Sequence, residues 1–283
     1  MEFKRVFRVQ GMDSNTNPKF QMVPSNSGKR YVALRDGAGA TVISVVPAIC
    51  TIVEIRENQL PADDRATGAQ AGDRYFCITG TTKGVGLIMV TRTGLLLPLF
   101  LEVGVKDKRE QLVMFHFVSD NARHRTRRPP AVIGQWLPDI NYIWKRQANV
   151  VFVRHGSQNL PVAQNLQATI THPEGQLGTT GTLLGTLGDQ TVNINVFFIW
   201  VLQNTNGTDT DALTTIGTAN SGGPGICMFE DDAGSGQMLS FAHELGHHMG
   251  LDHPGHRQID LMWDFSGQRG LNLTKADVNT ANP

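Results

Sequence analysis

This chain of 283 residues has few cysteines, no net charge and no long apolar run. Its three cysteines are too few for a disulfide scaffold, although Cys50 and Cys77 could pair in an oxidising compartment or stay as buried thiols. Lys+Arg and Asp+Glu balance at 25 each, which argues against a dedicated nucleic-acid or membrane-surface binder. No apolar run reaches the roughly 18 residues of a membrane-spanning helix.

The N-terminal stretch Met1–Gln10 lacks the apolar core of a secretory signal peptide. We therefore expect no transmembrane segment and no classical export signal. An unrestrained hydrolase would be harmful in its own cytosol. If the chain proves to be one, the sequence favours a protein that is secreted or delivered outside the cell by a non-classical route.

Turn-forming residues are abundant, with Gly 30 and Pro 13, and this favours a strand-rich chain. From Thr41 to Val105, short β-branched runs recur at roughly 8–12-residue spacing, which predicts a small antiparallel β-sandwich. Residues 1–40 are polar, and we expect them to be irregular. The charged stretch Lys106–Glu110 predicts a boundary between a β-rich domain, 1–106, and a second domain, 107–283.

The second half mixes strand and helix patterns and predicts an α+β fold. Gln111–Val118, Asn149–Val153 and Val192–Val201 are typical of strands. Helical spacing follows Pro129-Pro130, with a kink or break expected at Pro138.

Two charged segments are candidate binding sites, each with a plainer interpretation as a solvated loop. Arg123–Arg128 holds four arginines, which indicate either a solvated loop or a patch for an anion or partner. Asp209 and Asp211 could bind Ca²⁺, but two carboxylates in a loop are usually only solvated, so calcium is unsupported.

Histidine is concentrated in one segment of the chain. Five of the nine histidines lie between His243 and His256, within His243-Glu244-Leu245-Gly246-His247-His248-Met249-Gly250-Leu251-Asp252-His253 and the residues that follow. This is the pattern H-E-x-x-H-x-x-G-x-x-H. The chain's own residue frequencies give a chance expectation on the order of 10⁻⁵ for it, so the motif is specific.

The spacing of this motif suits a metal ion. On a helix, His243 and His247 lie about 40° apart on one face, and Glu244 lies beside them. Gly250 permits the left-handed conformation that ends a helix, so that His253 can turn back toward the same ion. Three imidazoles leave a fourth tetrahedral position for water, as in catalytic rather than structural zinc sites.

These residue types indicate hydrolysis of a carbonyl substrate. Zinc lowers the pKa of a bound water to about 7 and polarises a carbonyl oxygen. Glu244 is then the candidate general base, which takes a proton from water and passes it to the leaving amine.

The segment resembles the metzincin zinc peptidases, whose signature is this extended motif followed by a turn that contains methionine. Met262, in Ile259-Asp260-Leu261-Met262-Trp263, stands at the place of that methionine. The resemblance spans roughly 107–283. It implies a twisted mixed sheet, an active-site helix and a C-terminal helix, with Met262 as an apolar floor beneath His243, His247 and His253. Thr274 and Asp277 fit the capping box of that last helix.

The subfamily stays open between matrixin-like and adamalysin-like members. Gly250-Leu251-Asp252-His253 resembles the matrix-metalloprotease form, and Pro254 replaces the Asp of adamalysin-type members. Some metzincins have a zinc-binding Tyr two residues after the methionine, where this chain has Asp264. In the first half, Gly72–Val105 resembles a bacterial immunoglobulin-like repeat.

Other histidines and cysteines have plainer interpretations. His248 points to another flank of the helix, and His256 follows a Pro-Gly turn, so both are expected to be packing or surface residues. Cys227 fits a buried strand thiol. A cysteine that masks zinc in latent metzincins lies in a propeptide motif, which this sequence lacks.

The sequence leaves three candidate functions. The first is a zinc endopeptidase with Glu244 as general base, acting on a protein or peptide substrate. The second is a binding or delivery protein whose N-terminal domain docks to a partner and whose zinc site is accessory. The third is a zinc hydrolase of peptidoglycan peptides. Digestion with and without a chelator, and casein against purified cell wall, separate the three.

Overall fold

The computed structural model describes residues 1–66, 70–173, 176–206, 224–231, 237–263 and 269–283, and the backbone of 212–215. Helices and sheets occur together in these residues, so the predicted α+β class is confirmed. The chain divides into two compact units. Unit 1 comprises Met1–Arg109, Tyr142–Val150 and Asn272–Pro283, and unit 2 comprises Glu110–Asn141 and Val151–Leu271. The domain limits 1–106 and 107–283 stay a prediction.

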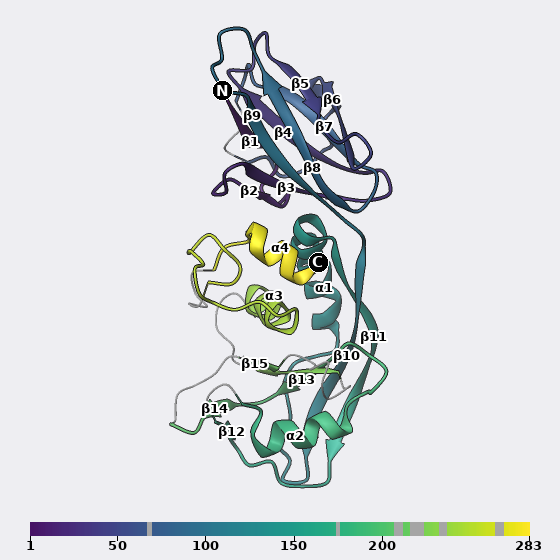
Figure 1. Ribbon diagram of the computed structural model, residues 1–283. Coiled ribbons are helices and arrows are strands. Elements are labelled where there is room, and N and C mark those ends of the chain that lie inside the picture. The colour runs from purple at the N-terminus through teal and green to yellow at the C-terminus, as the bar shows by residue number, and fades with distance from the viewer. Residues whose placement is uncertain (67–69, 174–175, 207–211, 216–223, 232–236, 264–268) are drawn as a thin grey trace. The chain divides into compact units, whose positions relative to one another are not determined.

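Unit 1 contains two sheets that share an apolar core, with a second, smaller apolar cluster around Phe7 (Figure 1). The strand orders are β1-β4-β7-β6 and β2-β3-β9-β8-β5. The elements are β1 (Glu2–Arg5), β2 (Met12–Asp13), β3 (Lys19–Pro24), β4 (Gly28–Arg35), β5 (Thr41–Ser44), β6 (Cys50–Ile55), the 3-10 helix η1 (Glu57–Gln59), β7 (Arg74–Gly80), β8 (Gly84–Thr91) and β9 (Leu99–Lys106). Buried residues from both sheets, among them Leu34, Phe76, Ile88 and Val103, form the core.

Residues 1–40 form strands β1 to β4, so the expectation of an irregular segment is wrong. Its polar side chains are satisfied inside the unit rather than solvated. Gln10 and Gln21 are buried, and the Gln10 amide donates to Gln21 Oε1 at 2.8 Å while its oxygen accepts from the Val6 and Phe7 backbones. The polar composition of residues 1–40 therefore did not indicate the buried strands that they form.

One of these strands also changes the sheet type. Strand β3 pairs with β9 in parallel, from Lys19↔Leu101 to Pro24↔Lys106. The antiparallel sandwich was predicted for Thr41–Val105, and the pairs β5–β8, β6–β7 and β8–β9 in that span are antiparallel. The parallel pair involves β3, which comes from the segment that was expected to be irregular.

Cys50 and Cys77 lie on neighbouring strands and are free thiols. Cys50 faces Gly80, and Cys77 faces Val53, so the two cysteines are three residues out of register. That offset is about 10 Å along a strand. A disulfide needs Cα atoms within about 7 Å, so these two cysteines cannot pair without a shift of the backbone.

Unit 2 is built on a mixed five-stranded sheet with the order β11-β10-β13-β16-β15. Strands β10, β13 and β16 are parallel, and the edge strand β15 is antiparallel to β16. The elements that follow β9 are β10 (Arg109–Asp120), α1 (Ala131–Ala148), β11 (Val150–Val162), β12 (Ile170–His172), α2 (Gly178–Leu187), β13 (Ile194–Ile199), β14 (Leu202–Asn204), β15 (Ala212–Thr215), β16 (Gly225–Glu230), α3 (Gln237–His248) and α4 (Lys275–Ala281). Helix α3 packs next to β15 and β16.

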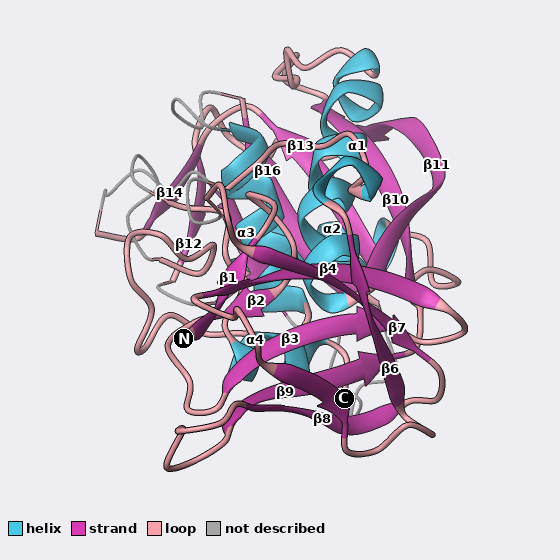
Figure 2. Cartoon of the chain, turned by 90° about the horizontal axis from the view of Figure 1, so that it is seen from above, coloured by secondary structure: helices cyan, strands magenta, loops and turns pink. Residues whose placement is uncertain are grey.

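Helix α1 runs without interruption through Pro138, so the break considered for that position does not occur. Apolar side chains are buried on both sides of the proline, with Ile133 before it and Ile140 and Trp144 after it. Packing of this face compensates for the hydrogen bond that proline removes. The Asn141 side chain joins α1 to the Phe152 backbone of β11 by two hydrogen bonds of 2.8 and 2.9 Å, and the two elements lie side by side (Figure 2).

The C-terminal part of α1, from Tyr142 onward, and helix α4 both belong to unit 1. The Arg30 guanidinium donates to the backbone oxygens of Lys145 and Arg146, where it meets the negative end of the helix dipole. The predicted capping box of α4 is present, because Thr274 Oγ1 accepts from Asp277 N and Thr274 N donates to Asp277 Oδ2.

Candidate metal centre

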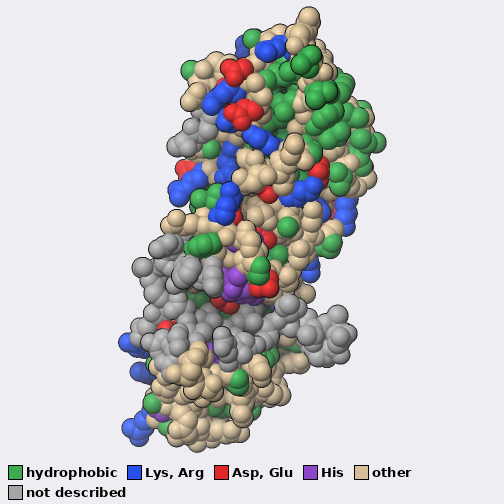
Figure 3. Space-filling view, turned by 60° about the vertical axis from the view of Figure 1, so that its left-hand side comes forward, with side chains coloured by type: hydrophobic (Ala, Val, Ile, Leu, Met, Phe, Trp, Pro, Cys, Tyr) green, Lys and Arg blue, Asp and Glu red, His purple; other side chains and the backbone are tan. Residues whose placement is uncertain are grey.

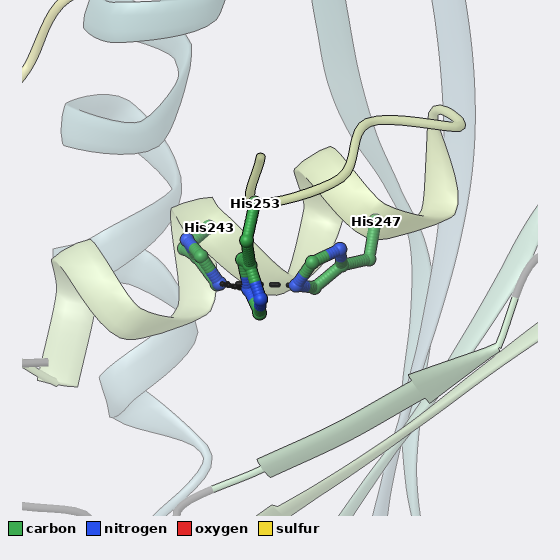
Figure 4. A group of neighbouring side chains, drawn as sticks. All are labelled: His243, His247 and His253. Carbon is green, nitrogen blue, oxygen red and sulfur yellow. Dashed lines mark hydrogen bonds between the residues drawn. The ribbon is translucent and has the colours of Figure 1, made fainter. Parts of the chain in front are cut away.

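Three histidines of unit 2 bring their Nε2 atoms together (Figure 4). His243 and His247 project from successive turns of α3, and His253 reaches them from the loop that follows. His243 Nε2 lies 3.0 Å from His247 Nε2 and 3.1 Å from His253 Nε2. Within the described residues this is the one group of side chains placed to share a metal ion.

The opposite ring nitrogens of two histidines are held by backbone oxygens. His243 Nδ1 lies 2.9 Å from Leu261 O, and His247 Nδ1 lies 2.9 Å from Leu251 O. A carbonyl oxygen only accepts, so each Nδ1 must carry the proton and donate it. In a neutral ring this leaves an unprotonated Nε2, which is the form that ligates metals.

Burial keeps His243 neutral. Its side chain is 1% exposed, and its pKa is lowered from 6.5 to about 2, first by burial and then by the positive charge of Arg269. When both rings are neutral, the Nε2 lone pairs of His243 and His247 face each other at 3.0 Å. Two lone pairs at this distance repel unless a cation lies between them.

The spacing of the nitrogens fits one cation. With Zn–N bonds of 2.0–2.1 Å, tetrahedral ligand nitrogens lie about 3.3 Å apart. The observed 3.0 and 3.1 Å are within a few tenths of that value. The donor set, which is three imidazoles and no thiolate, suits zinc or another borderline divalent ion.

A tight turn after α3 delivers the third histidine. The helix ends at His248, and Gly250 has φ +88, a conformation that costs glycine little. Gly250 N donates to His247 O at 2.9 Å, and Leu251 N donates to Gly246 O at 3.0 Å, which closes the helix end. The same turn supplies the Leu251 oxygen that holds His247.

Glu244 and Met262 lie close to the cluster in the chain. Glu244 follows His243 on α3 and is 8% exposed. Met262 is fully buried and follows Leu261, whose oxygen holds the His243 ring.

The remaining histidines make other contacts. His248 Nε2 faces Gln111 Oε1 at 3.3 Å, and His256 Nδ1 donates to His253 O at 2.9 Å. His124, in the arginine-rich segment, contacts Asp120 and stacks on Trp200. Cys227 is buried on β16. Asp209, Asp211 and Asp264 lie outside the described residues.

Sequence reasoning missed the partners that orient the ligands. The oxygens of Leu251 and Leu261 belong to the backbone and leave no signal in a motif. Arg269 was missed as well. Its Nε donates to Trp263 O at 2.9 Å and its Nη1 to Ser240 Oγ at 3.2 Å, which ties the turn after Asp260 to α3.

We expect Gly270→Ala to disturb this turn. A Cβ at Gly270 would lie 2.0 Å from Ile259 O, so the backbone before Asp260 and Leu261 must move. The free energy of unfolding should fall by roughly 2 kcal/mol or more, the scale of overpacking, and zinc affinity should fall with it. Urea unfolding and zinc titration measure both effects.

Gly134→Ala is the matched control for that prediction. A Cβ at Gly134, on α1, meets nothing within 4 Å, and alanine favours a helix by up to about 1 kcal/mol relative to glycine. Normal zinc affinity in Gly270→Ala would show that the turn does not position the ligands.

The metal-free protein should lose stability as the pH falls below 6.5. The unfolded chain protonates His243 near pH 6.5, whereas the folded chain does so only near its pKa of about 2. Between these values the unfolded state binds more protons, so the free energy of unfolding falls by up to about 1.4 kcal/mol per pH unit from this group. Urea unfolding in chelator at several pH values measures the slope.

Comparing wild type with His243→Asn isolates this contribution. Burial also lowers the pKa of His116, but His116 is present in both proteins and contributes equally to both slopes. The variant should show the shallower dependence on pH. Equal slopes in the two proteins would contradict the neutral state assigned to His243.

No family model matches this chain, and no curated protein sequence matches it. Among solved structures, metalloproteinase-II from Bacteroides fragilis is 12% identical with a TM-score of 0.41, over 93% of this chain and 83% of that one. Domains 4 and 5 of the S-layer protein SbsC are 14% identical with a TM-score of 0.21, over 36% of this chain and 53% of that one. Both scores are too low to assign a fold or function, so any assignment depends on the site itself.

Proposed function

We propose that the chain is a zinc-dependent endopeptidase. The observation that carries this proposal is the convergence of three Nε2 atoms on a helix that also carries Glu244 and on the loop after it, with the Nδ1 atoms of His243 and His247 held by backbone oxygens. A site with three imidazoles and no further protein ligand among the described residues is of the catalytic kind.

Each residue has a distinct part in this proposal. His243, His247 and His253 hold the ion, which would supply Lewis acidity and lower the pKa of water to about 7. Glu244 accepts a proton from the attacking water and delivers it to the leaving nitrogen of the peptide. Its burial at 8% exposure limits competition from bulk water.

The sequence motif supports a metzincin-like assignment, with the choice between matrixin-like and adamalysin-like subfamilies open. In this proposal Met262 forms an apolar floor beneath the ligands, and its full burial suits that part. An extended peptide substrate would pair with β15, the edge strand next to β16 and close to α3.

Peptide hydrolysis with and without metal tests the proposal. The protein as purified should cleave casein or a peptide library, lose this activity in a chelator and regain it with zinc. Cleavage of purified cell wall but not casein would favour a peptidoglycan hydrolase. Full zinc occupancy without hydrolysis of either substrate would favour a binding or delivery protein.

The place of action is also a proposal. Among the described residues no helix is long and apolar enough to cross a membrane. We propose action outside the cell, because a peptidase of this kind would damage its own cytosol. Detection of the protein only in washed cytosol would contradict this.

A further inference from the structure

The loop between β8 and β9 presents consecutive leucines to solvent. Leu95, Leu96 and Leu97 are 37%, 98% and 78% exposed. Figure 3 shows hydrophobic side chains, in green, gathered on the surface of unit 1. Single exposed leucines are common, but three in succession are not what a solvated hairpin requires.

The loop holds a defined turn. Leu95 N donates to Arg92 O at 3.0 Å, and Gly94 has φ +85. Pro98 then precedes the first residue of β9. The leucines therefore lie at the tip of a hairpin, with the cores of both strands already filled by Ile88, Val90 and Leu101.

Within the hairpin itself the charge is sparse and of one sign. From Gly84 to Leu101 the only charged residue is Arg92. Its guanidinium donates to Asp36 O at 2.9 Å. That neighbouring turn also carries the Asp36 carboxylate.

We propose that Leu96 and Leu97 insert into the interfacial region of a lipid bilayer, with Arg92 at the level of the lipid phosphates. An apolar tip above a cationic base matches the change from acyl chain to headgroup across this region. The zero net charge of the chain excludes binding by overall charge but not by a local apolar tip.

A protein partner fits this tip less well. A stable protein interface buries about 800 Å² on each side, which is more than three leucines at a hairpin tip supply. A lipid surface needs no complementary shape, because its acyl chains accommodate whatever apolar group enters.

Vesicle co-sedimentation of the full chain tests the proposal. The vesicles are phosphatidylcholine alone and an equimolar mixture with phosphatidylglycerol. We expect the wild type to bind both, and Leu96→Asp with Leu97→Asp to lower the partition coefficient by about 10². Arg92→Gln should weaken binding only to the anionic vesicles.

Val85→Asp is the matched control. Val85 is 67% exposed and lies six residues before Thr91 on β8, which places it about 20 Å along the strand from the loop. Val85→Asp introduces one negative charge, against two in the double variant, into an exposed apolar position, and it should leave binding within about twofold of wild type. Unchanged thermal midpoints show that the variants fold.

Three outcomes would overturn the proposal. The wild type could bind neither vesicle, or Val85→Asp could lose as much binding as the double variant, which would place the contact on the sheet face. The wild type could instead self-associate in solution through Leu96 and Leu97 without binding vesicles, which would make the tip a protein interface.

Discussion

Glu244→Gln is expected to lower peptide hydrolysis by a factor of about 10² or more, the usual scale for loss of a general base. Glutamine has nearly the same shape, so the fold and zinc content should stay unchanged. What is lost is the ability of the buried residue 244 on α3 to accept a proton. Steady-state cleavage of a peptide substrate, with zinc measured in the same preparation, gives the comparison.

The control for this variant is Glu57→Gln, the same change at the exposed helix η1 of unit 1. It should cleave peptides at the wild-type rate. Wild-type activity in Glu244→Gln with full zinc would remove Glu244 from the mechanism but leave the three-histidine site intact.

His253→Ala is expected to lose both zinc and activity. Its Nε2 lies 3.1 Å from that of His243 and is the one ligand nitrogen that comes from outside α3. Zinc content should fall from about one equivalent to near zero after dialysis, because two imidazoles on one helix bind a single ion far more weakly than three. Metal analysis and hydrolysis of the same peptide measure both losses.

His256→Asn is the matched control. His256 donates its Nδ1 proton to His253 O, and the asparagine amide can replace that donor. It should keep zinc and activity. If His253→Ala bound zinc as tightly as wild type, the convergence of the three rings would not be a metal site.

The candidate site was within reach of sequence reasoning because its spacing is local. The positions of His243, His247 and Gly250 follow from helix geometry and from the conformational freedom of glycine, and the structure brings the three predicted histidines together. Two strands of the second half, predicted at Gln111–Val118 and Val192–Val201, also lie near the observed limits of β10 and β13. The apolar pattern that marks these strands is local, because it depends only on residues close together in the sequence.

Elements that depend on distant partners were not predictable. Strand β3 is held by β9, some eighty residues away, and by the hydrogen bond from the Gln10 side-chain amide to Gln21 Oε1. No periodicity in the sequence encodes either contact. Helix α2 (Gly178–Leu187) is rich in glycine and threonine, which are poor helix formers. It buries Leu184 in the apolar cluster of unit 2, and that packing decides its conformation.

The two carbonyl oxygens that hold the ring protons of His243 and His247 have a consequence for engineering. Every amino acid carries the same peptide oxygen, so replacing the side chain at Leu251 or Leu261 leaves the tautomer of either imidazole in place. To change how these two rings are held, a designer would have to lengthen, shorten or reroute the loops, since point changes at those two positions leave the acceptors untouched.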